Sequence, residues 1–436
     1  MGFPFLSDEH QVVAPLPHAA PGAPEDPRTT VARQFLLELA LSLHRHGTPA
    51  HRLEKALGAA ARRLGIEAEF FATPTSLMVG IGRLGEQRVQ LLRVEPSEPN
   101  LSQLAELGRI TRDVTEGTIT PVDGLTRLKT MEEAPPLYPA WLVVLAFMLS
   151  ALAVACFLRV RTGDLLTAAF LGLLTGLIVR VAGRQEATRH VIPPLAAFLV
   201  SGAAFSADVL LGTRTGYATS LAGLAILLPG FTFTLALTEL STRHLASGTA
   251  RLSGAMVTFL GLGFGLALGA KAGTAMGELI HPLADGLPGL LSRAPLPGWT
   301  EWVALLVAPL AFTVLLNGPP REAGVIVIAC AAAYLTSKLA GARMGEELGA
   351  FLGAFVVSAG STWLARARRS VAMITQVPGL LILVPGSIGF RTMTSMLDQQ
   401  IEAGIATAFR LALIGISLAA GILAGNVVAR SQRVRI

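Results

Sequence analysis

The order of hydrophobic and polar positions divides the chain near Pro135 and Pro136. Before this point, apolar residues recur at spacings of three and four, as at Phe35, Leu39 and Leu43, which is typical of amphipathic helices. After it, charge-free stretches follow one another almost to the end of the chain. A helix needs about 20 apolar residues to cross about 30 Å of hydrocarbon. The pattern therefore predicts a mainly α, polytopic membrane protein with about ten transmembrane helices, preceded by a small α+β soluble domain.

The soluble domain is expected to contain two pairs of helices and a small sheet. A helical pattern over residues 29–65 is interrupted at His46-Gly47-Thr48-Pro49, where Thr48 is predicted to cap the second helix. The segment from Gly80 to Gly85 matches the dinucleotide-binding pattern G-x-G-x-x-G, but a strand follows it instead of a helix, so a hairpin turn is favoured. The predicted strands cover 66–71, 76–81 and 88–94, and the later helices cover 101–116 and 121–131.

The texture of the sequence predicts six successive regions. Residues 1–28 are rich in proline, alanine and acidic side chains and have no basic stretch ahead of an apolar one, so we expect a disordered tail and no signal peptide. The domain that follows is accordingly expected in the cytoplasm. The predicted regions are the tail (1–28), the α+β domain (29–134), a first five-helix membrane unit (135–270), a connecting loop (271–300), a second five-helix membrane unit (301–430) and a C-terminal tail (431–436).

Composition and charge favour the membrane class independently. The chain is 52% hydrophobic and 15% charged, whereas soluble domains carry about 25% charged residues. A pI of 9.9 would suit nucleic-acid binding, but residues 1–136 hold 14 Lys/Arg against 17 Asp/Glu, so no nucleic-acid partner is expected. Lys and Arg in the loops weakly favour the side of the N-terminus. This predicts a plasma (inner) membrane protein with its N-terminal domain and C-terminus in the cytoplasm.

The sequence contains no recognisable catalytic or metal-binding pattern. Cys156 and Cys330 each lie in an apolar run, so neither a metal site nor a disulfide is predicted, and no cofactor is expected. The zincin, serine-hydrolase and Walker motifs are absent, so the chain is not expected to be an enzyme. Any transport would then draw on an ion gradient instead of ATP hydrolysis by this chain.

The membrane region contains an internal repeat with a shift of about 156 residues. Leu228-Pro229-Gly230 aligns with Val384-Pro385-Gly386, and with one more residue of shift Phe198–Ser201 aligns with Phe355–Ser358. The predicted second and seventh spans, 165–179 and 323–337, are both short. An odd number of crossings places the second copy upside down, so a 5+5 inverted repeat is predicted, an arrangement that many secondary transporters use.

Breaks in the predicted spans are candidate binding sites. Pro229 and Gly230 lie in the middle of the fourth span, and Pro378, Gly379, Pro385 and Gly386 are predicted to interrupt the ninth. Unpaired backbone groups are tolerated in a membrane only where they face protein or water. The positive N-terminal end of a broken helix suits a carboxylate, although a simple packing kink is the alternative. The polar residues expected to line this binding site are Ser358, Thr375 and Gln376.

Three ionisable residues are candidates for proton coupling or gating. They are Glu239, Asp208 and Arg251, each near the end of a predicted span. Charges within membranes are costly and often mark ion pathways, although at the membrane surface a charge is ordinary. Glycines recur every four residues from Gly261 to Gly277 and from Gly341 to Gly353, which favours close helix packing and permits a homodimer.

Three stretches make the sequence similar to the threonine/serine exporter family. They are Gly47-Thr48-Pro49-Ala50-His51-Arg52-Leu53-Glu54, the segment from Thr238-Glu239-Leu240 to Ser247-Gly248-Thr249-Ala250-Arg251, and the segment from Val377-Pro378-Gly379 to Val384-Pro385-Gly386. The likeness covers nearly all of residues 30–430. It implies a soluble N-terminal part followed by ten spans in two five-helix units.

The resemblance also implies a function. It implies export of threonine and serine driven by the proton motive force, with a small molecule, protons and the lipid bilayer as partners. Some split relatives are linked to succinate export, so a dicarboxylate exporter is an alternative. An amino acid would place its ammonium near Glu239 or Asp208, whereas a dicarboxylate would need a second cationic partner such as Arg251 or Arg180. A membrane sensor or scaffold without transport is the alternative from another class.

Overall fold

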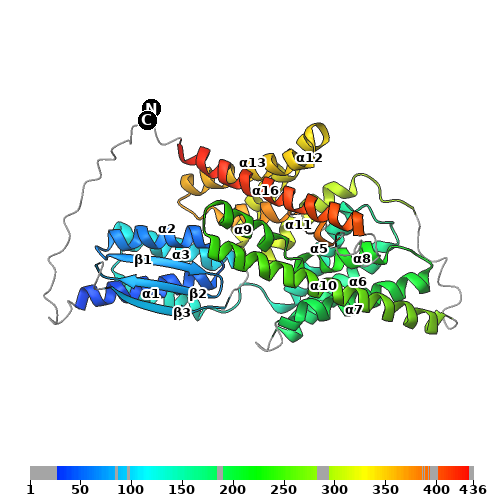
Figure 1. Ribbon diagram of the computed structural model, residues 1–436, viewed down its shortest axis with the longest axis horizontal. Coiled ribbons are helices and arrows are strands. Elements are labelled where there is room, and N and C mark those ends of the chain that lie inside the picture. Colours follow the sequence, from blue (N-terminus) through cyan, green and yellow to red (C-terminus); the bar gives the residue numbers. More distant parts are fainter. Residues whose placement is uncertain are drawn as a thin grey trace.

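A computed structural model describes residues 27–83, 87–95, 99–183, 190–281, 294–384, 386, 388–390, 392 and 401–431. Almost the whole of the predicted N-terminal tail, most of the predicted C-terminal tail and part of the predicted connecting loop lie outside these residues. An N-terminal domain lies at one end of a long bundle of apolar helices (Figure 1). Of the two ends of α10 (Leu245–Ile280), the start lies nearer the N-terminal domain (Figure 1).

The N-terminal domain is α+β, as predicted. Its three strands form one antiparallel sheet in the order β1-β2-β3, with Phe70 opposite Val79 and Val79 opposite Gln90. Gly82 follows β2 with a φ of 116°, which fits the predicted hairpin. The elements are α1 (Pro27–Arg45), α2 (Ala50–Arg63), β1 (Ala68–Thr73), β2 (Ser76–Ile81), β3 (Arg88–Arg93), α3 (Leu101–Glu116) and α4 (Pro121–Glu132).

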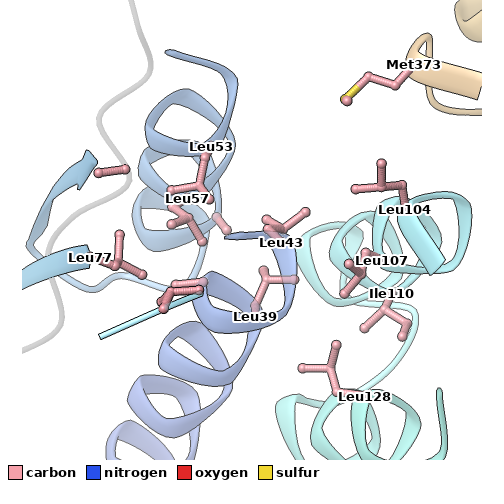
Figure 2. Close-up of a cluster of buried hydrophobic side chains, with 14 of the residues drawn as sticks. Leu39, Leu43, Leu53, Leu57, Leu77, Leu104, Leu107, Ile110, Leu128 and Met373 are labelled. Carbon is pink, nitrogen blue, oxygen red and sulfur yellow. The ribbon is translucent and has the colours of Figure 1, made fainter. Parts of the chain in front are cut away.

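The core of this domain follows from the alternation of its sequence. Leu77, Val79 and Ile81 point to the same side of β2 because side chains alternate along a strand, and all three are buried. Leucines of α1, α2 and α3 complete the cluster (Figure 2). Burying each such side chain stabilises the fold by about 2 kcal/mol. Met373 of the membrane part belongs to the same cluster, so the core continues across the boundary between the two parts.

The connection from α1 to α2 differs from the predicted cap. Pro49, with ψ at 145°, precedes the first residue of α2, and no side chain caps this helix. The hydroxyl of Thr48 is buried without a hydrogen-bond partner among the described residues. The predicted Thr48 cap is therefore wrong by one position, because the fixed φ of proline already starts the helix after Pro49. The α2 N–H groups stay available to other acceptors.

His44 gives the N-terminal domain a pH-dependent stability. Burial lowers the pKa of His44 below its ordinary value of 6.5, although its Nε2 donates a hydrogen bond of 2.6 Å to the Thr73 carbonyl. Below about pH 6.5, His44 is protonated in the unfolded chain but still neutral in the folded chain. The free energy of unfolding is therefore highest above about pH 6.5 and decreases as the pH falls towards the pKa of His44 in the folded chain. We expect the unfolding temperature of the full chain to fall between pH 7.5 and pH 5.5. The fall should be smaller in His44→Gln, and an equal fall in both proteins would contradict this origin.

The membrane part contains the helices that follow residue 139. They are α5 (Ala140–Phe157), α6 (Asp164–Ala182), α7 (Ile192–Leu211), α8 (Gly216–Leu224), η2 (Ala225–Leu227), α9 (Gly230–Ser241), α10 (Leu245–Ile280), α11 (Thr300–Leu315), η5 (Pro320–Glu322), α12 (Ala323–Met344), α13 (Glu346–Ala367), α14 (Met373–Leu381) and α16 (Ile401–Ser431). Within the described residues, seven helices are long and apolar enough to span a membrane, or eight if α8 and α9 form one broken span. The polytopic class is thus confirmed, and ten spans remain a prediction.

Two predicted span lengths are wrong. The second and seventh spans were expected to be short, but α6 has 19 residues and α12 has 22. Both helices continue past the charged residues at which the apolar stretches stop, Arg180 and Lys338. Long basic side chains can reach polar surroundings from within a helix, so a charge does not end a span. Similarly, α10 continues to Ile280, beyond the predicted boundary at residue 270.

Glycines let two helix pairs pack closely in the same way. On α10, a Cβ at Gly265 would meet the Pro194 carbonyl oxygen and Ala197 Cβ of α7. On α16, a Cβ at Gly421 would meet the Phe351 carbonyl oxygen and Ala354 Cβ of α13. Gly421 follows Gly265 by 156 residues, and its contacts Phe351 and Ala354 follow Pro194 and Ala197 by 157 residues. The glycine row of α10 is thus used for packing within the chain, so this row gives no support to a homodimer.

Candidate functional site

The membrane part contains a broken span. The segments Gly216–Leu227 and Gly230–Ser241 meet at a bend of 54°, with Pro229 immediately before α9. Gly230 is buried, and a Cβ there would meet Val384 Cγ1 and lie 3.1 Å from the Gly386 nitrogen. The backbone at Gly230 therefore lies against the backbone at Gly386, so the two segments that align in the sequence also meet in space. Only glycine allows this approach.

The ninth predicted span differs from the expectation. Pro378 and Gly379 lie inside α14 instead of at a break. Pro378 is the sixth residue of this helix, so it removes only the N–H that would reach Ile374, and the helix continues to Leu381. Pro385 lies outside the described residues. The predicted break at Pro378 and Gly379 is therefore wrong, whereas α14 ends at Leu381, before the second predicted break at Pro385 and Gly386.

Glu239 is the most completely buried carboxylate of the described residues, with 0% exposure. It lies in the last turn of α9. Its Oε2 accepts from the Ser247 hydroxyl at 2.7 Å, and the Arg251 Nε lies 3.1 Å from Oε1 and 3.0 Å from Oε2. Ser247 and Arg251 are four residues apart on α10, so they share one face of that helix. The turn between α9 and α10 therefore folds one anion onto one cation.

The third donor to Glu239 comes from the N-terminal domain. The backbone N–H of Ala50, the first residue of α2, donates to Oε1 at 3.0 Å. The first N–H groups of a helix lack partners within it and carry partial positive charge. Pro49, the residue before α2, has no side chain that could cap the helix. The carboxylate of Glu239 therefore accepts a hydrogen bond that a capping side chain would otherwise accept. The beginning of α2 thus closes over the buried ion pair.

A side-chain contact also joins the same helix to the membrane part. Arg52 Nη2 donates to Gln376 Oε1 at 2.5 Å, and Gln376 Nε2 donates to the Ser358 hydroxyl at 2.9 Å. Thr375 donates to Ser361 at 2.8 Å. The three polar residues predicted from the sequence, Ser358, Thr375 and Gln376, are all buried. The structure therefore places Gln376, and Ser358 beside it, against the N-terminal domain. Gln376 contacts α2, the same helix whose first N–H donates to Glu239.

Glu54 forms a second link from α2. One oxygen accepts from the Ala72 N–H at 2.9 Å, and the other lies 3.2 Å from His244 Nε2. His244 immediately precedes α10 and its ring lies 6.1 Å from that of His51. One carboxylate thus joins the sheet of the N-terminal domain to the turn that carries Glu239. We call Ala50, Arg52, Glu239, Ser247, Arg251 and Gln376 the Glu239 cluster.

Asp208 lies elsewhere. Its carboxylate accepts from the Thr213 hydroxyl at 2.6 Å and from the N–H groups of Thr215 and Gly216 at 3.1 and 2.8 Å. These donors are at the start of α8, where a carboxylate satisfies free backbone groups. Asp208 therefore caps a helix and is not brought to Glu239. Its role in proton coupling stays a prediction.

A second ionic cluster was not singled out in the sequence. Glu301, 9% exposed in the first turn of α11, pairs with Arg159 at 3.2 Å, with Lys338, and with the Tyr334 hydroxyl at 2.8 Å. The other end of α11 accepts N–H groups of the N-terminal domain, because Leu101 donates to the Leu316 carbonyl at 2.9 Å. Leu316 follows Glu301 by 15 positions, which makes a distance of about 22 Å along the helix. Glu301 therefore lies at the end of α11 away from the N-terminal domain, whereas Glu239 contacts that domain directly.

The Glu239 cluster draws on residues that sequence reasoning did not assign to a site. From the sequence, Ala50, Arg52 and Ser247 contribute only to the family resemblance. These residues could have been found from two stretches far apart in the chain, 47–54 and 238–251, which are both rich in polar residues. Within the described residues, no group of three His, Cys, Asp or Glu side chains is arranged to hold a metal ion.

Two protein families match most of this chain. Residues 34–272 match the family described as "Putative threonine/serine exporter". Residues 301–428 match a second family described as "Threonine/Serine exporter, ThrE". The first match contains the beginning of α2, Glu239 and Arg251, and the second contains Ser358 and Gln376. Both halves of the site therefore fall within matched regions.

The relatives are fungal membrane proteins. A pheromone-regulated membrane protein 10 from Eremothecium gossypii is 27% identical over 368 residues, which cover 82% of this chain and 48% of that protein. Proteins of the same name from Candida albicans and Saccharomyces cerevisiae are each 26% identical, over 83% and 81% of this chain and 33% and 46% of their own lengths. The chain thus spans less than half the length of these relatives. No solved structure matches it.

Proposed function

The chain belongs to the threonine/serine exporter family, and from this premise we propose that it is a secondary exporter of small hydroxy amino acids, threonine and serine, driven by the proton motive force. The observation that carries the proposal is the buried Glu239–Arg251 pair beneath the start of α2. A buried ion pair is costly to form and often has a specific role. Here one anion, one cation and a hydroxyl group lie together.

These groups complement a hydroxy amino acid. The ammonium of the substrate would replace Arg251 beside Glu239, and the substrate carboxylate would take the guanidinium. Ser247 and Gln376 offer hydrogen bonds to the substrate hydroxyl. Glu239 can hold either a proton or a cationic partner, so protonation and substrate binding compete at one carboxylate. Such competition is what coupling of substrate export to proton entry requires.

The internal repeat supplies the mechanical part of the proposal. We propose that α5 to α10 and α11 to α16 form two inverted five-helix units and that α11 and the span beginning with α14 also cross the membrane. The equivalent glycine contacts of Gly265 and Gly421, and the meeting of Gly230 with Gly386, support this. In alternating access, the Glu301 cluster closes one side while the other opens. The N-terminal domain covers the Glu239 side, which we place in the cytoplasm of a plasma-membrane protein.

A dicarboxylate exporter is the second candidate, because Arg52 adds another cation to the Glu239 cluster. The two candidates differ in what competes for transport. In proteoliposomes with a pH gradient, we expect export of labelled threonine to be inhibited by excess serine and unaffected by succinate. Inhibition by succinate alone would favour the dicarboxylate. Absence of any flux would favour a membrane sensor or scaffold.

A further inference from the structure

A basic groove runs between α3 of the N-terminal domain and the connection from α13 to α14. It consists of two hollows of about 380 Å³ and about 580 Å³ that share Arg369 and Ser370. Two glutamates, Glu116 and Glu322, also line it. The arginines of this basic groove are Arg109, Arg112, Arg321, Arg366, Arg368 and Arg369. Arginine thus outnumbers carboxylate three to one, so the groove is positively charged.

The positive charge of the groove is only partly compensated within the protein. Arg368 lies 3.5 Å from Glu322, and Arg109 lies 3.1 Å from Glu106. Arg112 instead donates to the backbone carbonyl group of Arg369. A carbonyl group carries no net charge, so it does not neutralise Arg112. In the part of the chain that the structure describes, neither Arg321 nor Arg369 has an acidic partner. The groove therefore offers guanidinium groups to an external anion.

The tryptophans place this groove at the membrane surface. All four tryptophans of the chain lie near helix ends and are at least 59% exposed. Trp141 is in the first turn of α5 and Trp363 near the end of α13, whereas Trp299 and Trp302 lie at the start of α11. Exposed tryptophans at helix ends are typical of the two membrane–water interfaces. Since Arg366 follows Trp363 by three residues, the groove lies at the level of lipid headgroups, on the side of the N-terminal domain.

We propose that the basic groove binds the phosphate-bearing headgroup of an anionic phospholipid. Guanidinium groups bind phosphate with paired hydrogen bonds, and each hollow lies in the range of about 300 to 1,000 Å³ that is usual for small-ligand sites. Arg109 and Arg112 belong to the N-terminal domain, and the other four arginines belong to the membrane part. A bound headgroup therefore holds the two parts together beside the Glu239 cluster. The site does not depend on the transported substrate.

The test is lipid binding by the purified full chain in neutral detergent. Phosphatidylglycerol and phosphatidylcholine are titrated separately, and retained lipid is counted by native mass spectrometry while the unfolding temperature is followed. We expect a preference of about tenfold for phosphatidylglycerol. The double variant Arg321→Ala/Arg369→Ala should lose this preference. Arg180→Ala/Arg343→Ala, which removes the same charge from exposed positions outside the groove, should keep it.

Three results would overturn the proposal. One is an unchanged lipid preference in the groove variant, and another is an equal loss in the control variant. The third is stabilisation by millimolar inorganic phosphate that phosphatidylglycerol does not exceed, which would identify a site for a free anion. If the double variant unfolds without lipid, Arg321→Gln and Arg369→Lys are compared instead. We then expect the first to weaken binding and the second to retain most of it.

Discussion

Replacing Glu239 with glutamine is expected to lower proton-driven export of threonine by about tenfold or more, a change in barrier of about 1.4 kcal/mol. The amide oxygen of glutamine can still accept from the Ala50 N–H, and its amide nitrogen can donate to the Ser247 hydroxyl oxygen, so the protein should reach the membrane in normal amounts. It cannot be ionised, and it leaves Arg251 without its anion. Breaking such a buried pair costs about 3–5 kcal/mol. Part of this cost should appear as a lower unfolding temperature.

The measurement compares two modes of transport in proteoliposomes. Export driven by a pH gradient should be lost, whereas exchange of internal for external threonine without a gradient should be affected less. Glu346→Gln is the matched control, because Glu346 is an exposed carboxylate 2.7 Å from Arg410. It should export at the normal rate. Normal gradient-driven export by Glu239→Gln would remove Glu239 from the coupling mechanism.

Replacing Gly230 with leucine is expected to abolish transport. Even a Cβ at this position would meet Val384 and the Gly386 backbone, so a leucine forces the two broken segments apart. Overpacking of this kind costs about 1–3 kcal/mol in a packed interior. The segments must also move against each other if the two units rock during transport. We therefore expect a loss of flux much larger than any loss of folded protein.

A leucine elsewhere in the membrane part provides the control for Gly230→Leu. Gly360 on α13 has nothing within 4 Å of an added Cβ, so Gly360→Leu should fold and transport normally. Gly230→Ala should lie between the wild type and Gly230→Leu. Folded protein is quantified by gel filtration and flux is measured per folded molecule. Full flux from Gly230→Leu would show that the break is a packing kink only.

The parts of the fold that depend on local pattern could be predicted from the sequence. The strand over Ser76–Ile81 and the helix over Leu101–Glu116 have the predicted bounds. Alternation of buried and exposed positions fixes the strand, and Asn100 and Gly117 cap the helix at either end. The break at Pro229 also followed from the chemistry of proline. In each case the signal lies within a few residues of the element.

The parts that depend on distant contacts could not be predicted. Glu239 was predicted as a candidate, but the N–H that donates to it belongs to Ala50, 189 residues earlier in the chain. Any residue except proline could provide such a backbone group, so the sequence does not mark it. Asp208 looked equivalent to Glu239 because both end a span, and only the fold shows that it caps α8. The predicted lengths of two spans were wrong for another reason. Arg180 and Lys338 lie within helices, whereas a prediction from apolar content alone ends those helices before these charged residues.

We propose that the start of α2, which closes over Glu239, moves away from it during transport. Ala50, at 2% exposure, reports on this seal directly, because Ala50→Cys keeps the backbone N–H. In a chain with Cys156 and Cys330 replaced by alanine, we measure labelling of Ala50→Cys by a membrane-impermeant maleimide. Val89→Cys, at a 66% exposed position of β3, serves as the reference. We expect slow labelling at rest and several-fold faster labelling when threonine and a pH gradient are supplied, with no change at Val89→Cys. Threonine export without any change in labelling at Ala50→Cys would contradict it.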